Sequence, residues 1–313
     1  MQRVLVTGGA GFIGRAVSSA FLARSVAVDV VDDLRVAPLQ QPLGNLMVKS
    51  VLDMDESDLD GVEVVYHLAS HKSVPESFDR PLEYLDNIDS GRHLLRLCAA
   101  SSVSRVIIGS TCEVYGNASM LPSAEHSPMS PMSPYAASKV ALEMLARAHQ
   151  QSRGQVEVTI ARLFNVFGPG ERTDALVPRL CHSALVRAEL PIEGSGLQRR
   201  DLSYVDDTVD KLVALARGPY VPVVNVGSGR SWSVRDVALQ IQQLAADATF
   251  VDLPGRRNEI AEFCADTSVM DSLHPRARAA TPVPIGIART FDWWSQRTTG
   301  TSTSHRSFEG VAS

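Results

Sequence analysis

Tyr135 and Lys139 are the residues whose types and spacing point most directly to chemistry. They stand four residues apart in a stretch that reads as a helix, so their side chains face the same way. A tyrosine hydroxyl has a pKa of about 10 and is a poor base at neutrality. A nearby ammonium group stabilises the phenolate and lowers that pKa. The pair can therefore take a proton from an alcohol while a hydride leaves the same carbon.

A second group of reactive side chains follows the strand expected at residues 105–110. Thr111 can hydrogen-bond the hydroxyl that Tyr135 would deprotonate, and Glu113 adds a carboxylate beside it. Parallel sheets bind ligands at the carboxyl ends of their strands. The Cys112 thiol, with an ordinary pKa of about 8.5, stays protonated but is a weak donor, so it either acts as an acid or only fills space. By itself this string is equally compatible with an ordinary strand end.

A glycine-rich turn occupies the start of the chain, in the string TGGAGFIG at residues 7–14. It follows an apolar strand and opens a helix. Glycines at positions 8, 11 and 14 let the backbone approach a pyrophosphate, which the free N–H groups of the helix start would bind. Asp32 lies eighteen residues beyond Gly14, at the end of the second strand. Its carboxylate would accept hydrogen bonds from ribose hydroxyls and repel a 2′-phosphate, so the cofactor expected is NAD.

Short apolar runs alternate with helical patterns through the first half of the chain. Such alternation predicts βαβ units, hence the α/β fold class with a Rossmann doubly wound parallel sheet. The expected strands are residues 4–7, 26–32, 62–68, 105–110 and 158–163, and the expected helices are residues 14–25, 81–100 and 134–151.

The amino-acid composition changes after residue 165, because residues 168–196 are rich in Pro, Gly and Arg. We therefore expect an NAD-binding Rossmann domain at residues 1–165 and a smaller C-terminal substrate-binding lobe at residues 166–297. Some segments of the lobe should return to the first domain. The Ser/Thr-rich run at residues 298–313 is expected to be a disordered tail.

Composition excludes several classes of function. The chain of 313 residues is 44% hydrophobic and 21% charged, with a formal net charge of −5, and no basic stripe suggests a nucleic-acid partner. No apolar run reaches the roughly 18 residues of a membrane helix, and the N-terminus does not read as a signal peptide. The four cysteines are scattered without a CxxC pair, which favours a reducing cytoplasm and no metal site.

Several strings, taken in order, resemble the extended short-chain dehydrogenases/reductases, the NAD-dependent nucleotide-sugar epimerases, dehydratases and decarboxylases. The resemblance covers nearly the whole chain, to about residue 297. The strings that carry it are TGGAGFIG, HLAS, YLDN, TCEVYG, SPYAASK, RLFNVFGPG and RRDLSYVDD.

The resemblance implies roles for particular residues. Tyr135 would be the base for the sugar 4-hydroxyl, assisted by Thr111, and Lys139 would bind the nicotinamide ribose. The other catalytic candidates are Glu113 and Cys112. The residues expected along the cofactor are Gly8, Gly11, Phe12, Ile13, Gly14, Asp32, Asp33, Leu34, Leu52, Leu68, Ala69, Ser70, Lys72, Asn87, Tyr135, Lys139 and Phe164.

The same resemblance implies a UDP-sugar partner and a substrate site. Arg200 and Arg256 would grip the diphosphate, with Glu259 on the nucleotide ribose. Leu176 and Ile192 would border a uracil-type base. The full set of residues expected around the substrate is Thr111, Asn165, Leu176, Val177, Ile192, Arg200, Arg256 and Glu259.

One position departs from the family pattern. An Asp in the turn after the third strand usually meets the adenine amine, whereas here the stretch reads KSVLDMD and Val51 takes that position. Either Asp53, through a shifted turn, or the backbone of Leu52 would then make the contact.

The Thr-Cys-Glu string bears on which reaction follows oxidation at C4. In the family, 4-epimerases follow the Thr or Ser with small or neutral residues, 4,6-dehydratases have Thr-Asp-Glu, and decarboxylases have Thr-Ser-Glu. Glu113 therefore favours chemistry at C5. The strings are most similar to UDP-N-acetylglucosamine 5,6-dehydratases of tunicamycin-type antibiotic biosynthesis, in which Glu113 would take the C5 proton and the C6 hydroxyl would leave, giving a 5,6-ene. The hydride could return to C4 or to C6.

Other functions stay open from the sequence. One is a UDP-sugar 4-epimerase. Another is a UDP-glucuronate decarboxylase, which needs a cation for the substrate carboxylate; His71 or Lys72 could serve. A non-enzyme alternative is an NAD-sensing module, which would typically lack the Tyr or the Lys that this chain retains.

The resemblance also implies a homodimer through a four-helix bundle made by the helices expected at residues 81–100 and 134–151. Both carry apolar stripes, although such stripes usually belong to the core. The stripe residues are Leu94, Leu95, Leu97, Val140, Leu142 and Leu145.

Overall fold

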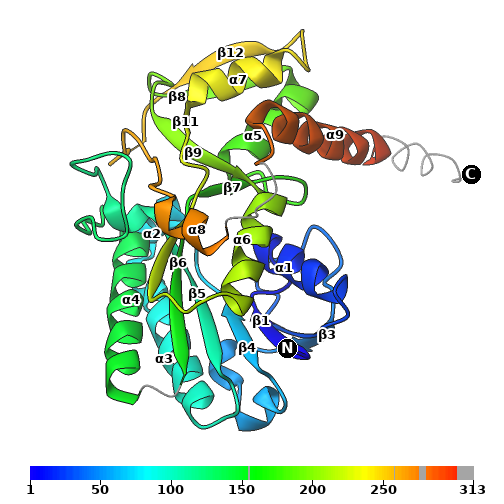
Figure 1. Cartoon of the computed structure of the whole chain (residues 1–313). Helices are drawn as coiled ribbons and strands as arrows, with labels where there is room; N and C mark the ends of the chain where they lie inside the picture. Colours follow the sequence, from blue (N-terminus) through cyan, green and yellow to red (C-terminus); the bar gives the residue numbers. More distant parts are fainter. Residues whose placement is uncertain (154–155, 257, 275–279, 302–313) are drawn as a thin grey trace, which may run out of the picture.

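The computed structural model describes residues 1–153, 156–256, 258–274 and 280–301. Two layers of structure are visible in Figure 1: a large parallel sheet with its helices, here called the sheet domain, and a smaller lobe beyond the carboxyl ends of the strands. Within the described residues, no helix combines the length and apolar composition needed to cross a membrane.

The sheet domain is built on seven parallel strands in the order β10-β6-β5-β4-β1-β2-β3. The strands read as nearly continuous apolar runs because helices cover both faces. Their bounds are β1 Arg3–Thr7, β2 Ala27–Asp32, β3 Asn45–Val48, β4 Val64–His67, β5 Arg105–Thr111, β6 Glu157–Leu163 and β10 Val223–Val226.

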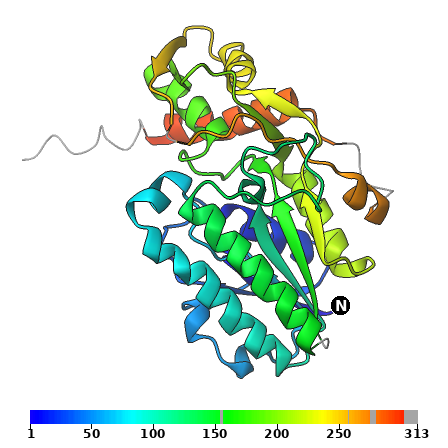
Figure 2. The same cartoon turned by 90° about the vertical axis from the view of Figure 1, so that its left-hand side faces the viewer.

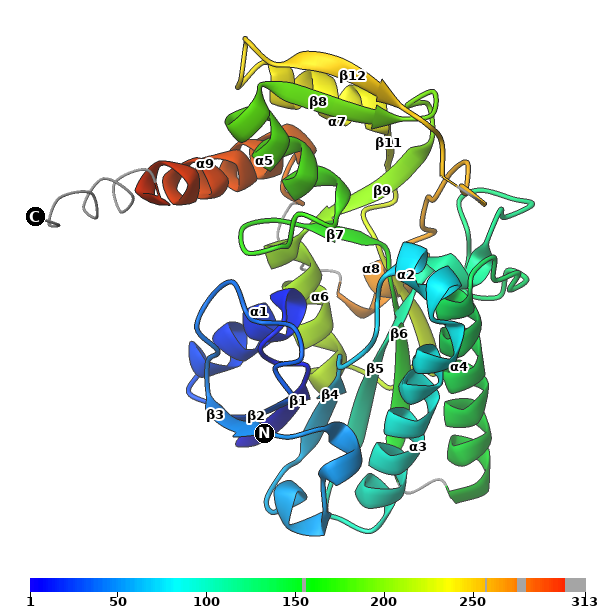
Figure 3. The same ribbon diagram turned by 180° about the vertical axis from the view of Figure 1, so that it is seen from behind.

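Helices pack on the two faces of this sheet, and Figures 1 and 3 show the two groups on opposite sides. Helices α1 (Phe12–Leu22) and α6 (Val205–Arg217) cover one face, while α3 (Asp86–Ala99) and α4 (Pro134–Arg153) lie side by side over the other, as Figure 2 also shows. Each face has its own buried apolar cluster. The expected doubly wound α/β fold is confirmed.

The smaller lobe contains two short sheets and three helices. One sheet has the order β11-β9-β7 and the other pairs β12 with β8. The elements of the lobe are β7 Asn165–Phe167, α5 Leu176–Arg187, β8 Glu189–Glu193, β9 Arg199–Tyr204, β11 Ser231–Ser233, α7 Val234–Gln242, β12 Thr249–Leu253 and α9 Val283–Thr301. The chain returns to the sheet domain through α6 and β10, and the short helix α8 (Ser268–Leu273) packs beside β10.

Short helical turns complete the sheet domain. They are the 3-10 turns η1 Val51–Asp53, η2 Glu56–Leu59, η3 Pro81–Leu85 and η4 Cys112–Tyr115, together with helix α2 Val74–Asp79. The helix expected at residues 81–100 is therefore two elements, η3 and then α3. In η3, the Tyr84 hydroxyl donates to the Ser73 carbonyl at 2.5 Å.

Two ends differ from the sequence expectation. Helix α1 starts at Phe12 and ends at Leu22, because Ser25 adopts a left-handed conformation with φ of 57° that closes the helix. Helix α9 continues to Thr301, past the boundary expected at residue 297. The rest of the expected tail, residues 302–313, lies outside the described residues.

Candidate active site

A cavity of about 1270 Å³ lies where the carboxyl ends of the sheet strands face the smaller lobe. Its wall includes Gly11, Asp32 and Thr111 from the sheet domain, and Leu176 and Arg200 from the lobe. Pockets for one drug-sized ligand measure about 300–1,000 Å³. This cavity therefore has room for two ligands, such as a dinucleotide and a nucleotide sugar.

The glycine turn between β1 and α1 forms one wall of the cavity. Gly8 has a φ of 70°, and a Cβ there would lie 2.6 Å from the backbone nitrogen of Ala69. A Cβ on Gly14 would collide with the Gly8 carbonyl. Helix α1 has no side-chain cap and no acidic residue in its first turn, so its amide dipoles at Phe12 and Ile13 face the cavity uncompensated. This wall fits the pyrophosphate of a dinucleotide.

Asp32 lies at the end of β2, at the edge of the same wall. Its carboxylate accepts hydrogen bonds from the backbone N–H groups of Ala10 (3.0 Å) and Leu34 (2.9 Å). These bonds fix the carboxylate at the cavity wall, where its remaining lone pairs can accept ribose hydroxyls. The geometry fits the expected NAD ribose site.

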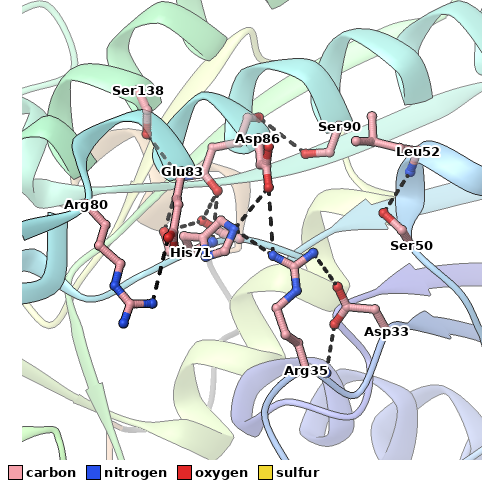
Figure 4. Close-up of polar contacts among 12 residues, drawn as sticks. Asp33, Arg35, Ser50, Leu52, His71, Arg80, Glu83, Asp86, Ser90 and Ser138 are labelled. Atoms are coloured by element: carbon pink, nitrogen blue, oxygen red, sulfur yellow. Dashed lines mark hydrogen bonds and ion pairs between the residues drawn. The ribbon is translucent and has the colours of Figure 1, made fainter.

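Polar side chains that follow β2 contact side chains at and before the start of α3, as Figure 4 shows. Arg35 pairs with Asp33 at 2.9 Å and with Asp86, at the start of α3, at 3.7 Å. The His71 ring lies 3.1 Å from the Arg35 guanidinium and 3.4 Å from Asp86. The sequence pointed to Asp33 but not to Arg35, because two of the partners of Arg35, His71 and Asp86, are distant in the chain.

In the turn after β3, Val51 and Leu52 line the cavity, whereas Asp53, the other candidate for the adenine contact, does not. The Val51 side chain is 6% exposed and belongs to the apolar core beneath α3. Ser50, directly before this turn, lines the cavity, and its hydroxyl accepts the N–H of Leu52 at 3.2 Å (Figure 4). Ser50 caps the turn, as Ser commonly does. A Ser directly before a turn is the feature of the sequence that could have identified it.

Six other residues expected along the cofactor line the cavity, and two of them, Asn87 and Lys72, also make polar contacts within the protein. Leu68, Ala69, Ser70 and Phe164 line the cavity. Asn87 is 2% exposed, and its amide bonds the backbone of His71 and the hydroxyl of Ser138. Lys72 is half-exposed and pairs with Asp174 of the lobe at 3.4 Å.

Tyr135 and Lys139 lie on the first two turns of α4 and are almost completely buried. The Lys139 ammonium donates to the Gly109 carbonyl at 2.9 Å. Burial lowers the pKa of Lys139 to about 8, against the opposing effect of Glu143. Burial also raises the pKa of Tyr135, while a hydrogen bond with Thr111 lowers it. Burial outweighs the Thr111 hydrogen bond, so the expected lowering of the Tyr135 pKa by Lys139 is not seen.

Glu113 lies in η4, just after Thr111. Its N–H donates to the Thr111 hydroxyl at 3.2 Å, which holds the turn against the strand end. Burial raises the pKa of Glu113 to about 7; Arg200 opposes this rise and Glu259 adds to it. A carboxyl group with such a pKa can both take and give a proton near neutrality.

Cys112 precedes Glu113 and is only 3% exposed. It packs in an apolar cluster with Val114, Phe164 and Phe263. Burial raises the pKa of the thiol well above its ordinary value, and the charge of Glu113 adds to this rise. The thiol is therefore protonated and reluctant to release its proton.

The lobe supplies two arginines to the cavity wall. Arg200 forms an ion pair with Glu259 and donates to the Ile260 carbonyl at 2.9 Å. Arg256 forms an ion pair with Glu193. Both arginines line the cavity together with Glu193 and Glu259. Glu193 was not identified from the sequence.

The apolar residues expected at the substrate differ in whether they line the cavity. Leu176 lines the cavity, but Val177 and Ile192 are 1% and 0% exposed and belong to the core of the lobe. The expectation that these two meet the substrate is wrong. Strand β8 alternates between half-buried and buried positions, and Ile192 falls on the inner face.

Two polar groups of the loop and strand after β6 have unsatisfied atoms. The side-chain oxygen of Asn165 and one carboxylate oxygen of Glu171 are buried without a hydrogen-bond partner in the structure. Both residues line the cavity. Asn165 was expected at the substrate. Glu171 was missed, although it lies directly after the matched string RLFNVFGPG. Buried polar atoms in a ligand cavity are commonly satisfied by the ligand.

Comparison with known proteins agrees with this geometry. The model of the NAD-dependent epimerase/dehydratase family matches residues 4–227. A solved structure of TunA, described as an NAD-dependent NDP-hexosamine 5,6-dehydratase involved in tunicamycin biosynthesis, is 54% identical with a TM-score of 0.93, over 95% of this chain and 99% of that one. The UDP-glucose 4-epimerase of Azospirillum brasilense is 34% identical over 80% of each chain. UDP-glucuronic acid decarboxylase 1 of Xenopus tropicalis is 32% identical, over 78% of this chain and 60% of that protein.

Proposed function

The chain belongs to the NAD-dependent epimerase/dehydratase family, and we propose that it is a dehydratase that removes water across C5 and C6 of UDP-N-acetylglucosamine. The observation that carries the proposal is the half-buried carboxyl group of Glu113 beside Thr111 and Tyr135, with a pKa of about 7. A simple epimerase has no use for a proton acceptor there, whereas elimination requires one.

The first step oxidises the sugar at C4. The glycine turn and Asp32 would hold NAD, which would supply reversible hydride transfer at C4, so that the overall reaction is a dehydration. Tyr135 takes the proton of the 4-hydroxyl, which Thr111 holds by a hydrogen bond. Lys139 stabilises the resulting phenolate, since its ammonium lies on the same face of α4.

The second step is elimination. The carbonyl at C4 acidifies the C5 proton, and Glu113 takes it. The C6–O bond breaks, the 5,6 double bond forms, and the leaving hydroxyl needs one proton to depart as water. Because the Cys112 pKa is raised well above its ordinary value, we propose that Glu113 itself delivers the proton that it took from C5. Finally, Tyr135 returns its proton to the C4 oxygen, which becomes a hydroxyl again. The substrate has then been converted to the 5,6-ene and water.

Binding of the UDP moiety is proposed for the lobe. Arg200 and Arg256 each pair with a carboxylate of the cavity wall, Glu259 and Glu193. A diphosphate can replace these partners, because guanidinium groups bind phosphate oxygens through two parallel hydrogen bonds. Glu259 would then be released to accept a ribose hydroxyl.

The sugar preference is proposed from the 54% identical neighbour, which is described as acting on an NDP-hexosamine in tunicamycin biosynthesis. Mass spectrometry and proton NMR of purified protein with UDP-N-acetylglucosamine test it. Loss of one water with new vinyl protons supports the proposal. Unchanged mass with an inverted C4 identifies an epimerase. Carbon dioxide released from UDP-glucuronate identifies a decarboxylase.

The alternatives have less support in the geometry. A decarboxylase needs a cation for the substrate carboxylate, but His71 lies against Asp86 and Lys72 pairs with Asp174. An NAD-sensing module has no need of the set Thr111, Glu113, Tyr135 and Lys139.

A homodimer through α3 and α4, working in the cytoplasm, completes the proposal. The stripe residues Leu94, Leu95, Leu97 and Leu142 are core residues. Other apolar side chains support an interface: Leu82 is 77% exposed, Leu85 50% and Met144 40%. Sedimentation should give a dimer for the wild type and monomer for Leu85→Asp, with Leu239→Asp in α7 as the control. A wild-type monomer at micromolar concentration would contradict the proposed dimer.

A further inference from the structure

A cluster of buried polar groups lies behind the catalytic residues. It consists of Ser110, Tyr115, Glu143, Arg162 and Asn225, here called the Arg162 cluster. Arg162 and Glu143 are each 1% exposed. The guanidinium donates to Glu143 through Nη2 at 2.7 Å and through Nε at 3.0 Å. None of the steps proposed above uses this ion pair.

The second side of the guanidinium contacts the turn that carries Glu113. Nη1 of Arg162 donates to the Tyr115 hydroxyl at 2.8 Å, and that hydroxyl donates to the Asn225 side-chain oxygen at 2.6 Å. The Arg162 guanidinium also lies over the Tyr115 ring, 4.8 Å from its centroid. Tyr115 is thus fixed both by its hydroxyl and by its ring.

Glu143 connects the cluster to the other catalytic residues. It follows Lys139 by one helical turn on α4, and it accepts the Ser110 hydroxyl at 2.6 Å. Ser110 lies between Gly109, whose carbonyl holds Lys139, and Thr111, which bonds Tyr135. One guanidinium therefore joins the helix of the C4 acid–base pair to the turn of the C5 base.

We infer that Arg162 and Tyr115 are positioning residues that hold Glu113 in register with Tyr135 and Lys139, so that C5 deprotonation follows C4 oxidation at the same bound sugar. This inference rests on the proposed dehydration. A buried ion pair is weak evidence for stability alone, because apolar residues of similar volume often stabilise as well. What an apolar pair cannot do is fix the angle between two catalytic elements through directed hydrogen bonds.

Tyr115→Phe tests the inference, because it keeps the ring and removes only the hydroxyl that links η4 to Arg162. The matched control is Tyr66→Phe: Tyr66 is also fully buried, and its hydroxyl donates to the Leu212 carbonyl at 2.8 Å, away from the cavity wall. Single-turnover experiments with UDP-N-acetylglucosamine measure C4 oxidation by the absorbance of the reduced cofactor, and elimination by the vinyl product.

For Tyr115→Phe we expect elimination to slow by about tenfold or more while C4 oxidation stays within about threefold, since small misplacements of a catalytic group are costly. Reduced cofactor should then accumulate, and the isotope effect of a C5-deuterated substrate on elimination should increase. Tyr66→Phe should leave the ratio of the two rates unchanged.

Equal losses in both steps, or no loss in either, would overturn the inference, because a merely stabilising cluster does not distinguish the steps. Should Tyr115→Phe not fold, Ser110→Ala provides the same test. It removes the Glu143 contact with the strand end and should slow elimination selectively by about threefold; an unchanged ratio would count against the cluster. Absence of elimination in the wild type would instead reject the proposed function.

Discussion

The two walls of the cavity hold their charged groups in opposite ways. On the sheet side, the Lys139 ammonium donates to the Gly109 carbonyl, and the backbone N–H of Glu113 donates to the Thr111 hydroxyl, which holds the Glu113 turn against the strand end. On the lobe side, Arg200 and Arg256 are held by carboxylates that also line the cavity. The first arrangement is fixed before the substrate arrives, whereas the second must exchange partners. Chemistry is therefore assigned to the rigid wall and recognition to the exchangeable one.

Tyr135→Phe should have the largest effect, because it removes the proton acceptor of the first step from the rigid wall. General acid–base groups contribute about 10²–10⁴ in rate, so we expect turnover to fall about a thousandfold. Tyr84→Phe is the control: its ring lies 6.2 Å from that of Tyr135, and its hydroxyl bonds only the Ser73 carbonyl among the contacts seen. Turnover is followed as product released per enzyme. Substantial turnover in Tyr135→Phe would remove this residue from the mechanism.

Glu113→Gln should separate the two steps. We expect elimination to fall by about a hundredfold or more while C4 oxidation survives, because the amide cannot accept the C5 proton. Glu262→Gln, in the lobe and away from the cavity wall, should behave as wild type. Transient absorbance of the reduced cofactor together with vinyl product gives both rates. Normal elimination in Glu113→Gln would show that another group is the base.

Arg200→Lys tests the lobe side of the cavity, where the arginines must exchange their carboxylate partners for the substrate. Lysine retains the charge but loses the planar pair of donors, so we expect KM for the UDP-sugar to rise about tenfold with kcat within about threefold. The neighbouring Arg199→Lys is the control, because Arg199 bonds Ser231 outside the cavity. A fall in kcat at unchanged KM would mean that Arg200 belongs with the catalytic wall.

The pH dependence of the rate should reflect the titration of groups on the sheet side of the cavity. Glu113, with a pKa of about 7, must lose its proton to act as a base, so the rate rises with pH through that value. Lys139, with a pKa of about 8, must keep its proton, so the rate falls above that value. We therefore expect a narrow bell-shaped profile of kcat/KM, whose lower limb disappears in Glu113→Gln. A rate that is constant between about pH 6 and about pH 9 would contradict both assignments.

Cys112→Ser should have the smallest effect. The thiol packs among apolar side chains and its pKa is raised, so a hydroxyl of similar size should keep turnover within about threefold. A loss of a hundredfold with normal C4 oxidation would make Cys112 the acid for the C6 hydroxyl, and Glu113 would then not carry that proton.

The same contrast explains what the sequence could predict. The glycine turn, the Tyr135–Lys139 pair and the Thr-Cys-Glu string were identified because each depends on short spacing within one or two elements. Arg35, Glu171 and Glu193 were missed because their surroundings are built by segments far apart in the chain. Val177 and Ile192 were misplaced because an apolar residue in the lobe carries no sign of whether it faces core or cavity.

The measurement that tests the account most directly uses UDP-N-acetylglucosamine carrying deuterium at C5, with the product analysed by mass spectrometry. We expect a product that has lost one water together with the C5 deuterium, because Glu113 removes the deuterium before the C6 hydroxyl leaves. A product of unchanged mass that retains the deuterium would contradict this expectation, since C5 would then take no part in the reaction.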